Sequence, residues 1–351
     1  MISFYPGPSR VYDAIKQYVA DAHREGVLSM NHRSPACTHL VQQTVRELKR
    51  KLKLPADYTV LFTSSATECW EIIAQSLIET RSTHLGNGAF AQKWFTYTQA
   101  LHPQAEYVAF DLEEPLPVHT HVKTDVICIT QNETSNGTQV DVALIKKIKQ
   151  QHDGPLIAVD ATSSLGGIRL DFTSADLWFA SVQKCFGLPA GLGLLICSPR
   201  ALQRAHQLNK RAHYNSLVNQ MRMMELFQTT HTPNVLGIYL LYRSLKDSPG
   251  ITTTDKRIRM QAKDWYAFLQ QHKILTALVK NNRLQSQTVI TVTVSPTQIT
   301  NVKKQATKAG FILGEGYGPW KETTFRIANF PALKPGELKK LQRFLKSYPQ
   351  K

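Results

Sequence analysis

The chain has 351 residues, of which 42% are hydrophobic and 19% are charged. This composition is typical of folded proteins and excludes a disordered, collagen-like or coiled-coil chain. Lys and Arg number 42 against 26 Asp and Glu, giving a formal net charge of +16, so binding to a polyanion such as nucleic acid has to be considered.

The first residues contain no basic start followed by an apolar run, and no apolar stretch approaches the ~20 residues of a membrane helix. We therefore expect a cytoplasmic protein. The five cysteines lack CxxC spacing, and Cys69, Cys128 and Cys197 lie in apolar surroundings, as expected of reduced core thiols. The one close pair of histidines, His119 and His121, has no third ligand nearby and predicts a surface loop rather than a metal site.

Short β-rich runs alternate with helical patterns through the first 247 residues. The predicted strands are residues 59–63, 106–110, 125–130, 156–160, 177–182 and 192–197. The predicted helices are residues 40–52, 68–79 and 142–149. This alternation predicts an α/β fold with an open, mostly parallel sheet covered by helices on both faces. Such sheets bind ligands beyond the carboxyl ends of their strands.

The pattern changes at the breaker cluster Asp247-Ser248-Pro249-Gly250. The later predicted elements are a helix at 260–271, a strand at 288–294, a helix at 297–309, a strand at 324–328 and a helix at 335–347. We therefore expect a large domain over residues 15–247 and a small C-terminal α+β domain over residues 248–351.

An acidic and a basic side chain follow two strands of the predicted sheet. Asp160 ends the strand at 156–160, and Gln183-Lys184 comes directly after the strand at 177–182. A buried lysine can lose its proton and attack a carbonyl carbon, and an aspartate facing a pyridine nitrogen keeps that nitrogen protonated. Capping residues and solvated charges are also common at strand ends, so the pair alone does not decide between these interpretations.

The segment Ser64-Ser65-Ala66-Thr67-Glu68 lies between a predicted strand and a predicted helix. Small residues there allow backbone N–H groups to approach a phosphate at the helix N-terminus. The alternative is a capping box formed by Ser65 and Glu68, and on the sequence alone this alternative is better supported.

Three further residues invite a functional and a structural interpretation. Phe90 follows a turn and either covers a flat ring or packs in the core. Thr134, within Asn132-Glu133-Thr134, either bonds a ring hydroxyl or forms a local turn. Arg326 lies inside an apolar strand and needs an anionic partner, which is either a ligand carboxylate or a structural ion pair.

The order of these features resembles the class V, fold-type I aminotransferases that use pyridoxal 5'-phosphate (PLP), and among them most closely the phosphoserine aminotransferases. The similarity runs from Phe4-Tyr5-Pro6-Gly7-Pro8 to Arg326. It implies a large domain with a mostly parallel seven-stranded sheet, and an N-terminal segment of residues 1–14 that packs with the small domain. It also implies transamination of phosphoserine and 2-oxoglutarate in serine biosynthesis.

The resemblance implies a role for each residue of a PLP site. Lys184 would hold PLP as a Schiff base and move protons, Asp160 would pair with the pyridinium nitrogen, Phe90 would stack on the ring and Thr134 would bond the phenolic oxygen. The phosphate would be held by Ser65, Ala66, Thr67 and Gln183.

The same resemblance implies a homodimer with shared active sites. His231-Thr232-Pro233 is similar to an Asn-Thr-Pro segment that reaches the phosphate of the neighbouring subunit's cofactor. Arg326 would bind the substrate's α-carboxylate. His32-Arg33 is similar to a pair that binds the substrate phosphate from the partner chain.

The sequence departs from this pattern at several positions. His231 replaces the usual Asn, and Thr323 and Thr324 replace the glycines before the carboxylate-binding Arg. Where a second His-Arg pair is usual, this chain has Gly318-Pro319-Trp320-Lys321, and Lys321 is the one cation available there. A substrate with two anionic groups needs two cationic subsites, so these changes bear on phosphoserine rather than on PLP.

Other functions remain open. An aminotransferase of the same class could use alanine or serine with glyoxylate or pyruvate. A persulfide-forming desulfurase needs a late loop cysteine, but no cysteine follows Cys197, and Gln183 stands where those enzymes usually have His. A basic nucleic-acid-binding protein is the alternative from another class. However, no RNA-binding or zinc-finger motif occurs, and the C-terminal lysines are spaced as on solvated helix faces.

Overall fold

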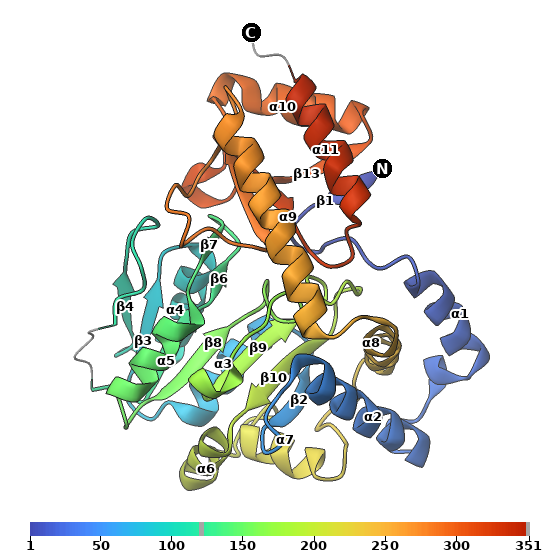
Figure 1. Ribbon diagram of the computed structural model, residues 1–351. Coiled ribbons are helices and arrows are strands. Elements are labelled where there is room, and N and C mark those ends of the chain that lie inside the picture. Colours follow the sequence, from blue (N-terminus) through green and yellow to red (C-terminus); the bar gives the residue numbers. More distant parts are fainter. Residues whose placement is uncertain (119–122, 349–351) are drawn as a thin grey trace.

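Two sheets organise the chain in the computed structural model, which describes residues 1–118 and 123–348 (Figure 1). The larger sheet has seven strands. In spatial order they are β2 (Thr59–Thr63), β10 (Gly193–Cys197), β9 (Leu177–Ser181), β8 (Leu156–Asp160), β5 (Val126–Thr130), β3 (Ser82–Gly86) and β4 (Glu106–Ala109). Strand β10 runs antiparallel to both neighbours, while the other adjacent pairs are parallel. The predicted α/β fold with a mostly parallel sheet is confirmed.

Helices and a small hairpin complete this part of the molecule. The helices are α1 (Ile15–Arg24), α2 (Pro35–Leu52), α3 (Ala66–Leu77), α4 (Ala89–Leu101), α5 (Val142–Gln151), α6 (Pro199–Leu208), α7 (Leu217–Met224) and α8 (Val235–Asp247), with 3-10 turns at Val27–Ser29 and Phe172–Ser174. The hairpin pairs β6 (Asn132–Glu133) with β7 (Thr138–Gln139). Helix α3 packs against β2, β9 and β10, and α4 packs against β3, β4 and β5.

The second sheet has five strands, in the order β1 (Ile2–Phe4), β13 (Phe311–Glu315), β14 (Thr324–Ala328), β12 (Val289–Thr293) and β11 (Thr276–Ala277). Its helices are α9 (Ile251–Gln271), α10 (Pro296–Lys308) and α11 (Pro335–Ser347), with a 3-10 turn at Gly318–Trp320. The first strand pairs in parallel with β13, so the N-terminus lies beside elements from the end of the chain (Figure 1).

The buried apolar side chains form two clusters, one around each sheet. Helix α9 contributes to both, because Ile251 and Ile258 belong to the first cluster whereas Trp265 and Leu269 belong to the second. The long helix in Figure 1 therefore connects the two cores, and the break at residues 247–250 separates α8 from α9 rather than one core from the other.

All predicted strands and helices are present, some with shifted bounds, and the differences have local causes. Strands β2, β8 and β14 and helix α11 have the predicted bounds. Helix α2 begins earlier than predicted because Ser34 caps it, accepting a hydrogen bond from the N–H of Cys37 at 3.2 Å. Strand β3 was not predicted, since its sequence Ser-Thr-His-Leu-Gly is mostly polar although all five residues are buried. No helix of the described residues is long and apolar enough to cross a membrane.

Candidate active site

A pocket of about 250 Å³ lies at the carboxyl ends of β5, β8 and β9. The last residues of these strands, Thr130, Asp160 and Ser181, all line it. The five-stranded sheet adds Arg326 from β14, and the N-terminal segment adds residues 5–8. The position agrees with the rule that open α/β sheets bind ligands beyond the carboxyl ends of their strands.

Lys184 lines this pocket and is 8% exposed. Its Nζ donates a hydrogen bond to Thr134 Oγ1 at 2.9 Å and lies 5.3 Å from the centroid of the Phe90 ring. The N-terminal segment closes over the lysine, and Gly7 comes so near that a Cβ there would lie 3.1 Å from Lys184 Cε. Three segments that are far apart in the chain, represented by Thr134, Phe90 and Gly7, therefore surround the lysine side chain.

Burial lowers the pKa of Lys184 to about 8, while the charge of Asp160 opposes this shift. Between pH 8 and about 10.5 the folded protein has therefore lost a proton that the unfolded chain retains. The free energy of unfolding of the PLP-free protein should rise with pH across that window, by up to about 3 kcal/mol, because the unfolded state binds more protons.

Urea unfolding at pH 7 to 10 tests this expectation, with Lys184→Met as the reference. The difference between wild type and variant should change by up to about 3 kcal/mol between pH 8 and 10 and be constant below pH 8. A difference that stays constant over the whole range would contradict the lowered pKa.

Asp160 is buried at the end of β8, and its burial raises the pKa of the carboxyl group. A hydrogen bond from the N–H of Thr162, at 2.9 Å, and the charge of Lys184 oppose the increase. A buried carboxylate in a pocket is stabilised by a cationic ligand group, such as a protonated ring nitrogen.

Four buried side-chain polar atoms of residues that line the pocket have no hydrogen-bond partner within residues 1–118 and 123–348. They are Trp70 Nε1, Thr130 Oγ1, Thr162 Oγ1 and Gln183 Oε1. Leaving such an atom unsatisfied costs about 1–3 kcal/mol. The pocket therefore fits a ligand that has hydrogen-bonding groups of its own, as PLP does.

The N-terminus of α3 forms one wall of the pocket. Ala66 and Thr67 line it, and the N–H of Ala66 donates to Ser181 Oγ at 2.7 Å. The capping alternative is also present, because Ser65 Oγ accepts a hydrogen bond from the N–H of Glu68 at 3.1 Å. The capping box is incomplete, however. The Glu68 carboxylate accepts hydrogen bonds from the N–H and Oγ of Ser64, both at 2.7 Å, rather than from the N–H of the N-cap residue Ser65. A helix N-terminus with this geometry favours an anionic group such as phosphate.

Phe90 is the second residue of α4, lines the pocket and is half-buried rather than part of the core. Its ring faces Lys184 on one side and lies 5.3 Å from the ring of Tyr317, between centroids. Tyr317 also lies 5.3 Å from the guanidinium of Arg326. Tyr317 and Ser181 could not be identified as pocket residues from the sequence, because neither belongs to a recognisable pattern.

Arg326 is 4% exposed and forms no salt bridge within the described part of the chain. Its Nε donates to the carbonyl of Glu315 at 2.6 Å, and Nη1 donates to the carbonyl of Thr134 at 2.9 Å. Burial lowers the pKa of this guanidinium. The structural ion pair considered from the sequence is thus not found among these residues, and the positive charge is free to bind a carboxylate in the pocket.

Six predicted site residues do not line this pocket: Ser65, His32, Arg33, His231, Thr232 and Lys321. Two of their segments are adjacent, because Arg33 Nη1 donates to Gln228 Oε1 at 2.6 Å, three residues before His231. Lys321 is exposed and follows the 3-10 turn at Gly318–Trp320. Lys93, which was not predicted, is the one other cation of the lining besides Lys184 and Arg326 among the described residues.

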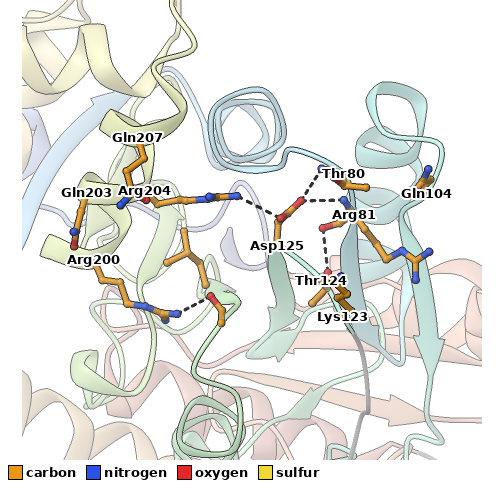
Figure 2. Close-up of a pocket in the computed structure, with 12 residues that line it drawn as sticks. Thr80, Arg81, Gln104, Lys123, Thr124, Asp125, Arg200, Gln203, Arg204 and Gln207 are labelled. Carbon is orange, nitrogen blue, oxygen red and sulfur yellow. Dashed lines mark hydrogen bonds and ion pairs between the residues drawn. The ribbon is translucent and has the colours of Figure 1, made fainter.

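A second, larger pocket of about 690 Å³ lies at the opposite, amino-terminal ends of β5 and β8 (Figure 2). Arg200 in this pocket pairs with Asp176 at 3.0 Å, and Arg204 contacts Asp125 at 3.4 Å. Arg81, the third arginine of this pocket, pairs with Glu106 at 3.2 Å, so among the described residues the pocket offers no arginine without an ion-pair partner. No cluster of three His, Cys, Asp or Glu able to hold a metal occurs in the described residues, and the His119–His121 pair lies outside them.

Known proteins share this fold and sequence. Residues 6–317 match the aminotransferase class-V family. The chain is 28% identical to a phosphoserine aminotransferase of Corynebacterium glutamicum (strain R), with 95% of this chain and 91% of the relative covered. A phosphoserine aminotransferase structure from Cytophaga hutchinsonii superimposes with a TM-score of 0.94 and 32% identity over 98% of each chain.

An alanine–glyoxylate aminotransferase from Nostoc sp. has the same fold, with a TM-score of 0.84 and 17% identity over 98% of this chain and 94% of that one. The family match covers most of the sequence and includes every element that lines the pocket except β14. The chain therefore belongs to the class V aminotransferases, and it is an enzyme of that family of PLP-dependent transaminases, with their fold-type I architecture.

Proposed function

We propose that the pocket around Lys184 binds PLP and transfers the amino group of phosphoserine to 2-oxoglutarate, as in serine biosynthesis. The observation that carries the proposal is that Lys184, Asp160 and Arg326 meet in one buried pocket, where Arg326 has no ion-pair partner among residues 1–118 and 123–348. The relatives named phosphoserine aminotransferase, in Corynebacterium glutamicum and Cytophaga hutchinsonii, support the choice of substrate. We also propose a cytoplasmic location, supported by five buried cysteines without disulfides.

The pocket's unsatisfied and charged groups fit the functional groups of PLP. Asp160 would hold a proton on the ring nitrogen, Thr134 would bond the ring hydroxyl, and Phe90 would cover one face of the ring. Ala66, Thr67 and Gln183 would bind the phosphate at the start of α3, while Ser65 would stabilise that helix N-terminus. When bound, PLP supplies a ring that accepts the electrons left behind when a proton leaves the substrate's Cα.

The protein's own groups would bind, orient and deprotonate the substrate. The free edge of Arg326 would bind the α-carboxylate in the pocket. The low pKa of Lys184 makes its neutral amine available near pH 8. The amine can therefore remove a proton from the substrate's Cα and then donate that proton to a different carbon atom. Gly7 and the residues around it would exclude water from the lysine by covering it.

We further propose a homodimer in which each subunit completes the other's site. The predicted partner-directed residues, His32, Arg33, His231 and Thr232, lie outside their own pocket, and the Arg33–Gln228 bond joins the two segments. In this arrangement Arg33 would bind the substrate phosphate in the partner's pocket. The second candidate, an alanine– or serine–glyoxylate aminotransferase, is favoured by the exposed position of Lys321 and by Trp320 where a cation is usual.

Absorbance spectra of the protein with PLP test the choice between these substrates. Phosphoserine should convert the visible band of covalently bound PLP to the shorter-wavelength band of the pyridoxamine form, whereas serine and alanine should not. Arg33→Ala should raise the KM for phosphoserine about 10–100-fold, since hydrogen bonds to charged groups contribute about 1.5–3 kcal/mol.

The control for this variant is Arg46→Ala, which removes an exposed arginine of α2 and should leave KM unchanged. Conversion by alanine or serine, but not by phosphoserine, would move the proposal to the second candidate. An unchanged KM in Arg33→Ala would remove Arg33 from the substrate site.

A further inference from the structure

Glu133 is a buried carboxylate beside the pocket that the proposed reaction does not use. It is 2% exposed, and each of its oxygens accepts two hydrogen bonds. Oε2 accepts from the N–H groups of Phe90 and Ala91, both at 3.1 Å. Oε1 accepts from the N–H and Oγ of Ser135, at 3.0 and 2.7 Å. The carboxylate therefore binds the first turn of α4, which carries Phe90.

This contact depends on a close approach of two backbone segments. A Cβ at Gly88 would lie 2.3 Å from Cγ of Glu133 and 2.7 Å from Oγ of Ser135. Ser135 Oγ in turn accepts from the N–H of Ala89 at 3.0 Å. The sequence around Gly88 thus leaves room for the carboxylate directly beneath the start of α4, where the helix dipole favours a negative charge.

An ordinary helix cap does not require this arrangement. Other helices of the protein are capped by residues at their own N-cap positions, such as Asp141 before α5, where the carboxylate is exposed. Glu133 instead comes from a distant hairpin, and burying a carboxylate without a salt-bridge partner is costly. No salt bridge to Glu133 occurs in the part of the chain that the structure describes.

The residue after Glu133 links this carboxylate to the charged groups of the pocket. The next residue, Thr134, accepts the hydrogen bond of Lys184 through Oγ1 and that of Arg326 through its carbonyl. One three-residue segment thus contacts the lysine, the free arginine and the helix turn that holds Phe90. A shift of Glu133 would move Phe90 relative to Lys184.

We propose that Glu133 is a positioning residue, which fixes Phe90 against the pocket and thereby sets the plane of the bound cofactor ring relative to Lys184. The inference rests on the proposed function, because it concerns the ring that this pocket would bind. Glu133→Gln keeps the shape of the side chain but replaces one acceptor oxygen by an NH2 group, which cannot accept either pair of donors.

A double-mutant cycle with Phe90→Ala tests whether Glu133 acts through Phe90. The readouts are the Kd for PLP, from titration of the PLP-free protein, and the visible circular dichroism of bound PLP, which reports the environment of the ring. Glu133→Gln should weaken PLP binding about tenfold and reduce the dichroism at least by half. In the Phe90→Ala background the same change should alter Kd by less than about twofold.

Asp125→Asn is the matched control at the far end of the sheet. Asp125 Oδ2 also accepts hydrogen bonds from backbone N–H groups, those of Glu79, Thr80 and Arg81 at 2.7–3.0 Å, in the pocket of Figure 2. This variant should lower the Tm but leave the Kd for PLP and the dichroism unchanged. The inference would be overturned if Glu133→Gln changed the Kd for PLP equally with and without Phe90. It would also be overturned if Asp125→Asn reduced the dichroism as much as Glu133→Gln does.

If Glu133→Gln does not fold, Ser135→Ala tests whether the contacts of Glu133 act on PLP binding through Phe90. It removes one hydrogen bond to Oε1 and the one from the N–H of Ala89, and should weaken PLP binding about threefold, again only when Phe90 is present. An identical loss without Phe90 would count against the proposal. If wild-type protein formed no visible band with PLP, the proposed function itself would fail, whereas normal binding without coupling would remove only the role of Glu133.

Discussion

Replacing Lys184 with alanine is expected to abolish the visible band of bound PLP and to lower turnover by about 10⁴-fold, the upper range for loss of a general base. The reason is that Lys184 supplies the buried amine of the pocket, with its pKa lowered by burial, hydrogen-bonded to Thr134 and facing Phe90. Absorbance spectra and steady-state rates measure both effects.

Lys146→Ala is the matched control for this variant, because Lys146 is an exposed lysine of α5 that pairs with Asp171 outside the pocket around Lys184. It should leave the spectrum and the rate unchanged. A Lys184→Ala protein that kept steady-state transamination would show that the amine has been assigned to the wrong residue.

Replacing Arg326 with glutamine should raise the KM for both the amino acid and the oxo acid by about 10²–10³-fold, with a smaller change in kcat. Truncating one partner of a buried, hydrogen-bonded charge pair costs about 2–5 kcal/mol, and here the lost partner would be the substrate carboxylate. Arg326 is suited to this role because its two protein hydrogen bonds go to carbonyls rather than to a carboxylate.

Arg326→Lys should recover only part of the affinity, because an ammonium cannot form the two parallel bonds of a guanidinium. Arg259→Ala, which removes an exposed arginine of α9, serves as the control. If Arg326→Gln folded with an unchanged Tm and an unchanged KM, the carboxylate would have to bind elsewhere, and Lys93 would be the next cation of the pocket to test.

The fold could be predicted wherever strands were continuous apolar runs. Strands β2 and β8 have the predicted bounds because each is a short run of β-forming residues between polar turns. Strand β3 could not be found in this way, because its burial depends on the strands and helices around it rather than on an apolar sequence. The antiparallel direction of β10 also depends on pairing between distant segments, which periodicity does not encode.

The site could be predicted in part from strand ends. Asp160 and Lys184 were identifiable because Asp160 ends one buried strand and Lys184 follows another, and the sheet brings them into one pocket. The alternatives for Arg326 could not be resolved without coordinates, since both predict the same buried arginine. Tyr317 and Glu133 were not identified, because their contacts with Phe90 join segments that are far apart in the chain.

Reduction of the PLP-loaded protein with borohydride, followed by peptide mass mapping, tests the central claim most directly. Reduction fixes PLP to whichever amine holds it. We predict one added pyridoxyl phosphate group per chain, on the peptide that contains Lys184 and on no other. Labelling of a different lysine, such as Lys93 in the same pocket, or the absence of any labelled peptide, would contradict the assignment of Lys184 and of the site built around it.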